Sequence, residues 1–145
     1  MKISTKGRYA IRMLLDLAEH KNDGFIALKD IAERQDISKQ YLEHIVSLLN
    51  TSDILRANRG KKGGYMLARE PSECKIGEIL RITEGSLAPV ACLDDKTNLC
   101  NRSEFCKTLS MWSGFYKMII DYFDSITLQD MLDQYDGQSA NSYMI

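Results

Sequence analysis

Residues 28–67 constrain the fold of this chain more than any other segment. Apolar residues recur at helical spacing over residues 28–35 and again over 38–50, which predicts two helices separated by a tight turn. Asp36 lies in that turn, where Asp tolerates the left-handed conformation better than most non-glycine residues. Ser38 is a good N-cap for the second of these helices. The expected core face of this helix is Leu42, Ile45, Val46 and Leu49.

A glycine-rich basic loop between two strand-like runs follows directly. Residues 54–58 and 65–67 flank the loop 59–64, whose sequence is Arg-Gly-Lys-Lys-Gly-Gly, and together they predict a β-hairpin. Helix, tight turn, helix and basic hairpin, at this short spacing, is the order of a winged helix-turn-helix domain. Few other small domains need these parts in this order. The predicted fold class is therefore mainly α with a small β-hairpin.

Most of the remaining chain is also predicted to be helical. A helix over residues 8–20 has an apolar face at three-to-four spacing, and a fourth helix runs from residue 76 to a stop at Gly85. Residues 86–103 are polar, acidic and irregular. A short last helix restarts at residues 125–128, and residues 136–145 are expected to form a loose polar tail. The apolar face of the first helix is Tyr9, Met13, Leu14 and Leu17.

A seam of apolar residues at heptad-type spacing marks the C-terminal part of the chain. Its members are Phe105, Leu109, Trp112, Tyr116, Ile119 and Phe123. Such a seam can pack against the chain's own domain or against a helix of a second protomer. Because the domain is small and the seam is long and aromatic, we favour the second protomer. The predicted architecture is a winged helix-turn-helix domain (1–85), a cysteine-bearing sensor loop (86–106), and a long dimerisation helix with a C-terminal tail (107–145).

The charges divide the chain into a basic half and an acidic half. Residues 1–70 hold 13 Lys and Arg against 9 Asp and Glu, a net charge of +4, whereas residues 71–145 hold 6 against 11, a net charge of −5. The overall net charge of −1 hides this division. The basic half predicts contact with a polyanion. No apolar run approaches the roughly 18 residues of a membrane span, and the first six residues lack the apolar stretch of a signal peptide, so we expect a cytoplasmic protein without a membrane partner.

Candidate DNA-contacting side chains come from the second helix of the pair and from the hairpin loop. In a helix-turn-helix this helix lies in the major groove, with polar side chains near its N-terminus at base edges and phosphates. An arginine at the tip of a wing suits the negative potential of a narrow minor groove, and lysines suit phosphates. Tyr41 is expected at the boundary between the core and the DNA. The predicted set is Ser38, Lys39, Gln40, Tyr41, Glu43, His44, Arg59, Lys61 and Lys62.

Three of the four cysteines, Cys92, Cys100 and Cys106, lie within fifteen residues. In a reducing cytosol such a group indicates metal or redox chemistry more than structural disulfides. Three thiolates on a loop can converge on one inorganic centre. We favour an iron–sulfur cluster over zinc or thiol-based redox sensing, and over no ligand at all. Cys74 precedes the fourth helix and is expected to be a partly buried structural thiol.

Several motifs resemble those of the Rrf2 family of bacterial transcription regulators, and the resemblance covers nearly the whole chain. The motifs are Met-Lys-Ile-Ser-Thr-Lys-Gly-Arg-Tyr-Ala at residues 1–10, Ile37-Ser38 with Tyr41-Leu42-Glu43, and Arg59-Gly60 with Gly63-Gly64-Tyr65. The resemblance implies a repressor that binds a palindromic double-stranded DNA operator as a homodimer built on the helix at 105–124. It also implies that Ser38, Gln40, Tyr41, Glu43, His44 and Arg59 lie at the DNA surface.

The cysteine-bearing loop is similar to that of the cluster-binding members of this family, with two departures. The IscR type has a histidine three residues after the last cysteine, where this chain has Leu109. The NsrR type uses an acidic residue near the N-terminus, where this chain has Arg8. The resemblance therefore implies an iron–sulfur cofactor whose fourth ligand is open. The candidates are a residue of the other subunit, an exogenous thiol, Asp94, Asp95 and Glu104.

A second branch of the family gives the alternative. Residues 84–90 and the C-terminal Ser-Tyr-Met-Ile resemble CymR-type repressors of cysteine metabolism, which associate with cysteine synthase and need no bound cluster. A free C-terminal carboxylate is readily captured by a binding site. Under this alternative, Ile145 would contact the synthase.

Other classes of function fit less well. No histidine lies near the grouped cysteines and no glycine-rich nucleotide loop follows a strand, so we do not expect an enzyme. A winged domain that contacts only proteins would bind with little dependence on salt. A DNA-binding protein would weaken steeply as salt rises.

Overall fold

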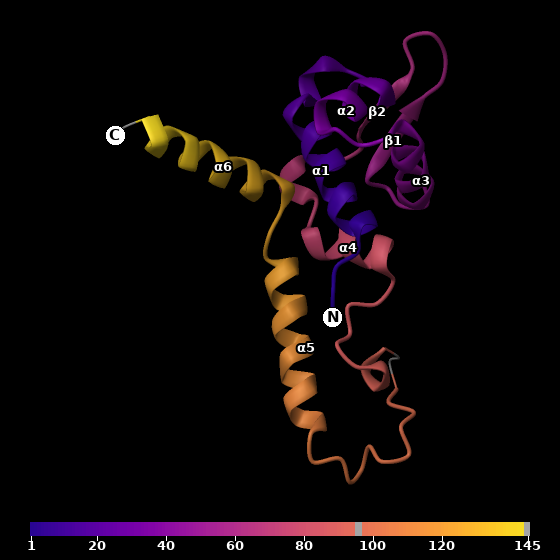
Figure 1. Ribbon diagram of the computed structural model, residues 1–145, viewed down its shortest axis with the longest axis vertical. Helices are drawn as coiled ribbons and strands as arrows, with labels where there is room; N and C mark the ends of the chain where they lie inside the picture. The colour runs from indigo at the N-terminus through magenta and orange to yellow at the C-terminus, as the bar shows by residue number, and fades with distance from the viewer. Residues whose placement is uncertain (95–96, 144–145) are drawn as a thin grey trace.

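The computed structural model describes residues 1–94 and 97–143, with side chains up to Gln138. Figure 1 shows the helices and the hairpin of residues 5–84 grouped in one domain, from which the helix at 109–124 leads downward and the last helix projects sideways. Among the described residues, no helix is long and apolar enough to cross a membrane. The elements are α1 (Thr5–Glu19), α2 (Leu28–Gln35), α3 (Lys39–Leu49), β1 (Leu55–Asn58), β2 (Gly64–Leu67), α4 (Ile76–Glu84), α5 (Leu109–Asp124) and α6 (Leu128–Tyr143), with 3-10 turns at Lys21–Asp23, Pro71–Glu73 and Ala91–Leu93.

The turn between α2 and α3 has the geometry that the sequence predicts. Asp36 takes the left-handed conformation, with φ at 53°, and ends α2. The Ser38 hydroxyl accepts a hydrogen bond from the backbone N–H of Tyr41 at 3.1 Å and so caps α3. All four residues of the predicted core face of α3 are buried. The predicted helix, turn and helix are confirmed.

The predicted hairpin is confirmed as well, and its base is fixed to the domain. β1 and β2 are antiparallel, with Leu55 opposite Leu67. Ile26 and Tyr65 exchange two backbone hydrogen bonds, each 2.8 Å long. Gly64 permits this close approach, because a Cβ atom there would lie 2.2 Å from the Ile26 carbonyl oxygen. The wing therefore leaves the domain from a rigid base.

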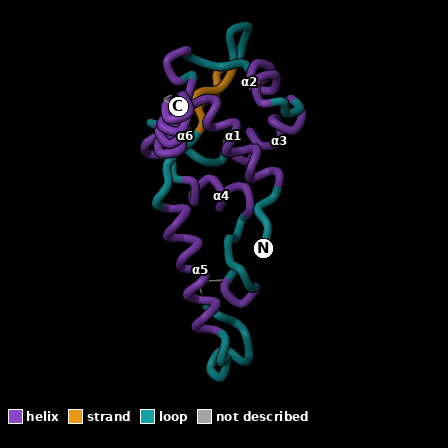
Figure 2. The backbone as a smooth tube through the Cα atoms, turned by 60° about the vertical axis from the view of Figure 1, so that its left-hand side comes forward, coloured by secondary structure: helices purple, strands orange, loops and turns teal. Residues whose placement is uncertain are grey.

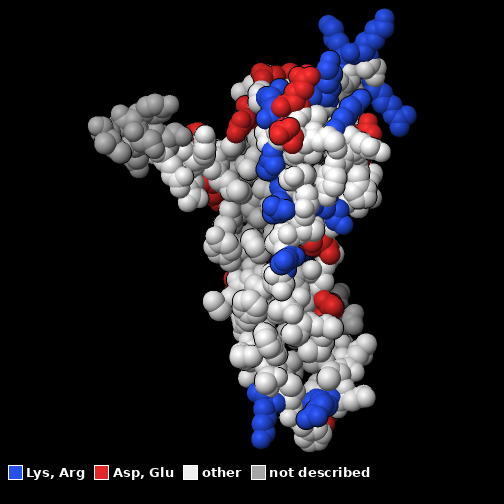
Figure 3. All heavy atoms as spheres, viewed as in Figure 1, with Lys and Arg blue, Asp and Glu red and all other residues white. Residues whose placement is uncertain are grey.

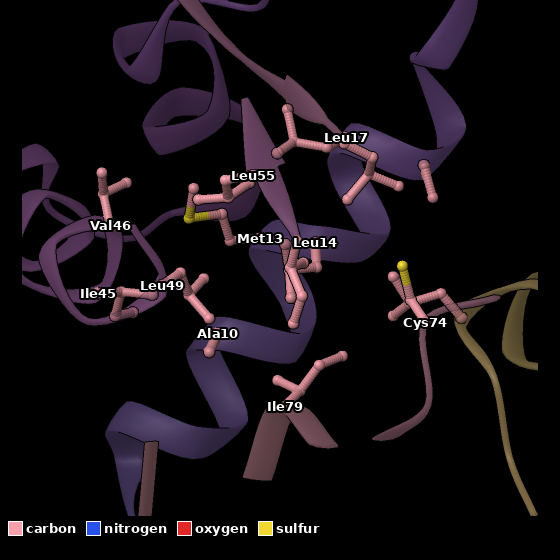
Figure 4. Packing of buried hydrophobic residues seen from close by; sticks show 14 of the residues in the cluster. Ala10, Met13, Leu14, Leu17, Ile45, Val46, Leu49, Leu55, Cys74 and Ile79 are labelled. Atoms are coloured by element: carbon pink, nitrogen blue, oxygen red, sulfur yellow. The ribbon is translucent and has the colours of Figure 1, made fainter. Parts of the chain in front are cut away.

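A single hydrophobic cluster joins the elements of the domain (Figure 4). Met13 and Leu14 of α1 are fully buried within it, beside residues of α3, α4 and the hairpin. The cluster also includes Ile119 of α5 and Leu128 of α6. The core thus contains residues from both sides of the predicted domain boundary at residue 85.

The chain returns to the domain between α5 and α6. The Ile76 N–H donates to the Ile126 carbonyl at 2.9 Å, and the Leu128 N–H donates to the Cys74 carbonyl at 3.0 Å. These two bonds join the start of α4 to the link between α5 and α6. The excursion formed by the cysteine-bearing loop and α5, seen along the lower half of Figure 2, therefore begins and ends at α4.

Helix α5 differs from the prediction in its start and in the residues that the domain covers. Phe105 lies before the helix, with 78% of its surface exposed. Ile119 is buried in the chain's own core, and Tyr116 and Phe123 pack against that core. Its own domain buries Ile119, which leaves that side chain unavailable to a second subunit. Tyr116 and Phe123 are only half-buried, and the pairing of two subunits along the seam stays a prediction.

A different apolar stripe on α5 is exposed. Its members are Met111, Phe115, Met118 and Tyr122, with exposed fractions of 57, 44, 71 and 63%. They follow one another at a spacing of 4, 3 and 4 residues, which is the spacing of one helix face. The helix is thus apolar on two faces, one covered by the domain and one open.

Helix α6 is longer than the short last helix that the sequence predicts. The predicted loose tail from residue 136 is wrong as far as Tyr143, where the helix ends. A reciprocal cap starts the helix: the Thr127 N–H donates to the Asp130 carboxylate at 2.9 Å, and the Asp130 N–H donates to the Thr127 hydroxyl at 3.1 Å. This cap and the buried Leu128 anchor the first turn, from which the rest of the helix extends.

Candidate nucleic-acid interface

The N-terminal half of α3 presents polar side chains outward because its opposite face is buried in the core. Tyr41 is half-buried at the boundary, as expected. Its ring packs edge-on against the ring of Tyr9 in α1, with 5.5 Å between the ring centroids. The other predicted residues of this helix and its cap are exposed: Ser38, Lys39, Gln40, Glu43 and His44.

The wing adds a basic surface beside α3. Arg59, Lys61 and Lys62 are exposed on the loop between β1 and β2. Figure 3 shows basic side chains gathered at this projecting loop. Gly60 has φ at 120°, a conformation that side chains other than glycine rarely adopt, and its carbonyl accepts a bond from Gly63 N–H at 3.0 Å. A compact loop with three cations at its surface suits contact with phosphates or a minor groove.

A groove of about 400 Å³ lies between α2, α3 and the wing. The predicted residues Lys39, Glu43 and Arg59 line it. Lys29 of α2 and Asn58 of β1 line it too, and neither was predicted from the sequence. The position of Lys29 in the first turn of α2 was a usable signal, since lysines and helix N-termini both bind phosphate.

The three grouped cysteines lie on the irregular chain between α4 and α5. Cys92 lies in the 3-10 turn and Cys106 lies just before α5, both half-buried, whereas Cys100 is exposed. All three are free thiols. Among the residues that the structure describes, no three His, Cys, Asp or Glu side chains lie close enough to hold a metal ion. In this arrangement the cysteines do not fit an iron–sulfur cluster.

Two of the cysteines have shifted ionisation. The Cys106 sulfur lies 3.3 Å from the Thr108 hydroxyl, and hydrogen bonding by the side chain and backbone of Thr108 lowers the pKa of Cys106. Burial raises the pKa of Cys74, which is fully buried in the core. The thiolate, the form that reacts with electrophiles and binds metals, therefore forms more readily at Cys106 than at Cys74.

Two of the other residues proposed from the sequence are exposed. Asp94 accepts a hydrogen bond from the Ser86 hydroxyl, and Glu104 makes part of the surface before α5. Asp95 and Ile145 lie outside the described residues.

A helix-turn-helix whose exposed polar helix lies beside a basic, projecting hairpin defines a winged-helix DNA-binding protein. The chain belongs to the Rrf2 family, described as iron-dependent transcriptional regulators, and the family match spans residues 3–134. The predicted class of transcriptional regulator is confirmed.

Two kinds of named regulator are similar to this chain. CymR of Bacillus subtilis (strain 168) is 36% identical over 99% of this chain and 98% of its own length. The solved structure of B. subtilis CymR, described as the global cysteine regulator, matches 92% of this chain and 98% of its own, with 32% identity and a TM-score of 0.75. The structure of IscR from T. potens matches 93% of this chain and 88% of its own, with 41% identity and a TM-score of 0.74. These similarities confirm the winged-helix fold and favour neither kind over the other.

Proposed function

We propose that this regulator binds a palindromic DNA operator as a homodimer and represses transcription. The observation that supports this function is the exposed polar start of α3 beside the basic wing, on either side of one groove. A helix of this kind enters the major groove, and its outward side chains contact base edges. The wing then reaches the neighbouring minor groove through Arg59 and the phosphates through Lys61 and Lys62.

The experiment that tests this function replaces Arg59 and measures binding to a duplex that the wild-type protein selects from a random pool. Arg59→Ala should weaken binding about tenfold or more, the order of one lost base or groove contact. Lys75→Ala is the matched control, since it removes the same charge from an exposed position at the start of α4. Equal affinity of the Arg59→Ala variant and the wild type would contradict the proposed role of the wing.

The homodimer is proposed to form through the open stripe of α5. Met111, Phe115, Met118 and Tyr122 leave a row of large apolar side chains in water, which association with a second copy would cover. A two-fold dimer presents two copies of α3 to two half-sites, and this symmetry matches a palindromic operator.

The signal is proposed to enter through Cys92, Cys100 and Cys106. The description of the family as iron-dependent and the similarity to IscR support an iron–sulfur cluster there. Because the three thiols are not gathered in this structure, cluster binding requires the loop to bring them together. Anaerobic reconstitution followed by iron and sulfide analysis tests this proposal. Wild type and Cys74→Ala should retain iron and Cys100→Ser should lose it, whereas wild type without iron would contradict the cluster.

The similarity to CymR supports a second candidate for the signal. Under this candidate the chain controls cysteine metabolism without a cluster, and its C-terminal Ile145 binds cysteine synthase. Deletion of Ile145 should then lower the affinity for the synthase in a pull-down or titration. Unchanged affinity would contradict capture of the terminal residue.

A further inference from the structure

A buried carboxylate on α1 holds the end of α2. Asp16 is 1% exposed, in a helix whose neighbouring residues form the hydrophobic core. Arg34 binds both of its oxygens, with Nε at 3.0 Å from Oδ2 and Nη2 at 2.7 Å from Oδ1. The Gln35 side-chain amide donates a third hydrogen bond to Oδ2 at 3.1 Å. The hydrogen bond to Asp16 raises the pKa of Arg34, so the guanidinium stays charged.

A second side chain of α1, one helical turn before Asp16, contacts the same end of α2. Arg12 donates to the Gln35 backbone carbonyl, and its Nε lies 3.4 Å from the Gln35 side-chain oxygen. Asp36, in the left-handed conformation, follows at once and sets the direction in which α3 begins. The last turn of α2 is therefore fixed to α1 directly before the turn that leads into α3.

The same network continues along the α1–α3 contact to the exposed surface. The Arg12 guanidinium lies over the Tyr9 ring, 5.1 Å from its centroid. Tyr9 packs edge-on against Tyr41, whose ring lies 6.4 Å from the ring of His44. A continuous set of contacts thus links the buried Asp16 to the outward face of α3.

Core stability alone gives no reason for this arrangement. Burial of the Asp16 carboxylate is costly, and its partner Arg34 stays 38% exposed, so the contact is not one that an apolar core requires. The forked guanidinium–carboxylate pair fixes one geometry between the two helices, which apolar packing does not do. A small rotation of α3 would move its side chains away from base edges, because base contacts depend on direction.

We propose that Asp16 and Arg34 are positioning residues that set the orientation of α3 and thereby the discrimination between DNA sequences. This inference rests on the proposed function of α3 as the helix that contacts base edges. The contacts of the separate wing with phosphates depend little on this orientation.

The experiment compares binding to a duplex selected from a random pool by the wild type with binding to a scrambled duplex of equal length. Arg34→Lys keeps the charge but loses the fork. Asp16→Leu with Arg34→Leu removes both charges together. We expect both variants to lose about tenfold in the ratio of the two affinities, the order of one lost base contact. The salt dependence of binding to the scrambled duplex should stay the same, because the phosphate contacts remain.

Arg81→Lys is the matched control, since Arg81 makes the same forked contact with Asp124 between α4 and α5, far from α3 in the chain. Its ratio should equal that of the wild type. An unchanged ratio in folded Arg34→Lys, or an equal loss in Arg81→Lys, would overturn the positioning role. If the wild type enriches no duplex, the operator-binding function fails first, and this inference fails with it.

Discussion

Asp36 shows how one backbone conformation decides where a helix ends. With φ at 53°, this residue needs a side chain that accepts the left-handed region. Asp36→Val should lower the free energy of unfolding by about 1–2 kcal/mol, because a β-branched side chain is strained there. Asp36→Gly should be neutral or stabilising, since glycine is not strained at this φ. Urea denaturation followed by circular dichroism measures both, and equal midpoints for Val and wild type would contradict the argument.

Cys106 and Cys74 should react at different rates, and the sequence makes the reaction of each cysteine easy to measure. Trypsin cleavage after Lys and Arg places each cysteine in its own peptide: 70–75, 82–96, 97–102 and 103–107. In the metal-free protein, Cys106 should be alkylated with a lower pH midpoint than the thiol of a free cysteine, because hydrogen bonding from Thr108 lowers its pKa. Cys74 should react only after denaturation, because burial both hides it and raises its pKa. Mass spectrometry of the peptides over a pH series gives the alkylation rates.

Thr108→Val tests the cause of the Cys106 shift. This variant should move the pH midpoint for alkylation of Cys106 upward, and an unmoved midpoint would contradict the role of Thr108.

The sequence alone predicted the cap, the turn and the outward face of α3, since each of these features depends on a few neighbouring residues. It missed Asp16, because apolar periodicity identifies a buried face and says nothing of a charge within it. The partners of Asp16 come from another helix, so the pair exists only after α1 and α2 have packed. The groove residues Lys29 and Asn58 were missed for the same reason, because the groove forms only between elements.

Between elements, the contact of α1 with α4 depends on a glycine. The Glu84 carboxylate accepts hydrogen bonds from the Ser4 N–H at 3.1 Å and from its hydroxyl at 2.6 Å. A Cβ atom on Gly7 would lie 2.3 Å from that carboxylate. Gly7→Ala should therefore displace Glu84 and cost about 1–2 kcal/mol of stability.

Two comparisons isolate this effect. Gly137→Ala in α6, where a Cβ atom meets nothing within 4 Å, should instead stabilise by about 0.5–1 kcal/mol. In a Glu84→Ala background the penalty of Gly7→Ala should largely vanish. Equal penalties in both backgrounds, measured by thermal unfolding, would show that the clash lies elsewhere.

Apolar periodicity did not predict which face of α5 packs against the domain. Both the covered face and the open face of this helix are apolar, and both repeat at heptad-type spacing. A pattern of this kind predicts a helix but does not say which face meets the domain. The extent of α6 was missed because its last turns lack an apolar face of their own, and a reciprocal cap at its start supports the helix instead.

Lysine substitutions at two adjacent residues of α5 should affect different properties of the molecule, its dimerisation in one case and its folding in the other. Met118 is 71% exposed and belongs to the open stripe, whereas Ile119 is 9% exposed and belongs to the core. Met118→Lys should leave the fold intact but shift the protein to monomers, because the ammonium would be buried between the two copies. Ile119→Lys should unfold the domain or greatly lower its melting temperature. Analytical ultracentrifugation and thermal denaturation distinguish the two effects. A folded Met118→Lys dimer would contradict the proposed interface.

The buried position of Leu128, and its hydrogen bond to the Cys74 carbonyl, have a consequence for protein synthesis. The proposed DNA-contacting surface is complete by residue 67, long before the ribosome reaches the residues that close the core beneath it. A nascent or prematurely terminated chain that lacks Leu128 would leave α4 and the end of the core uncovered. Such fragments should be degraded rather than accumulate as defective competitors that occupy operators without responding to a signal.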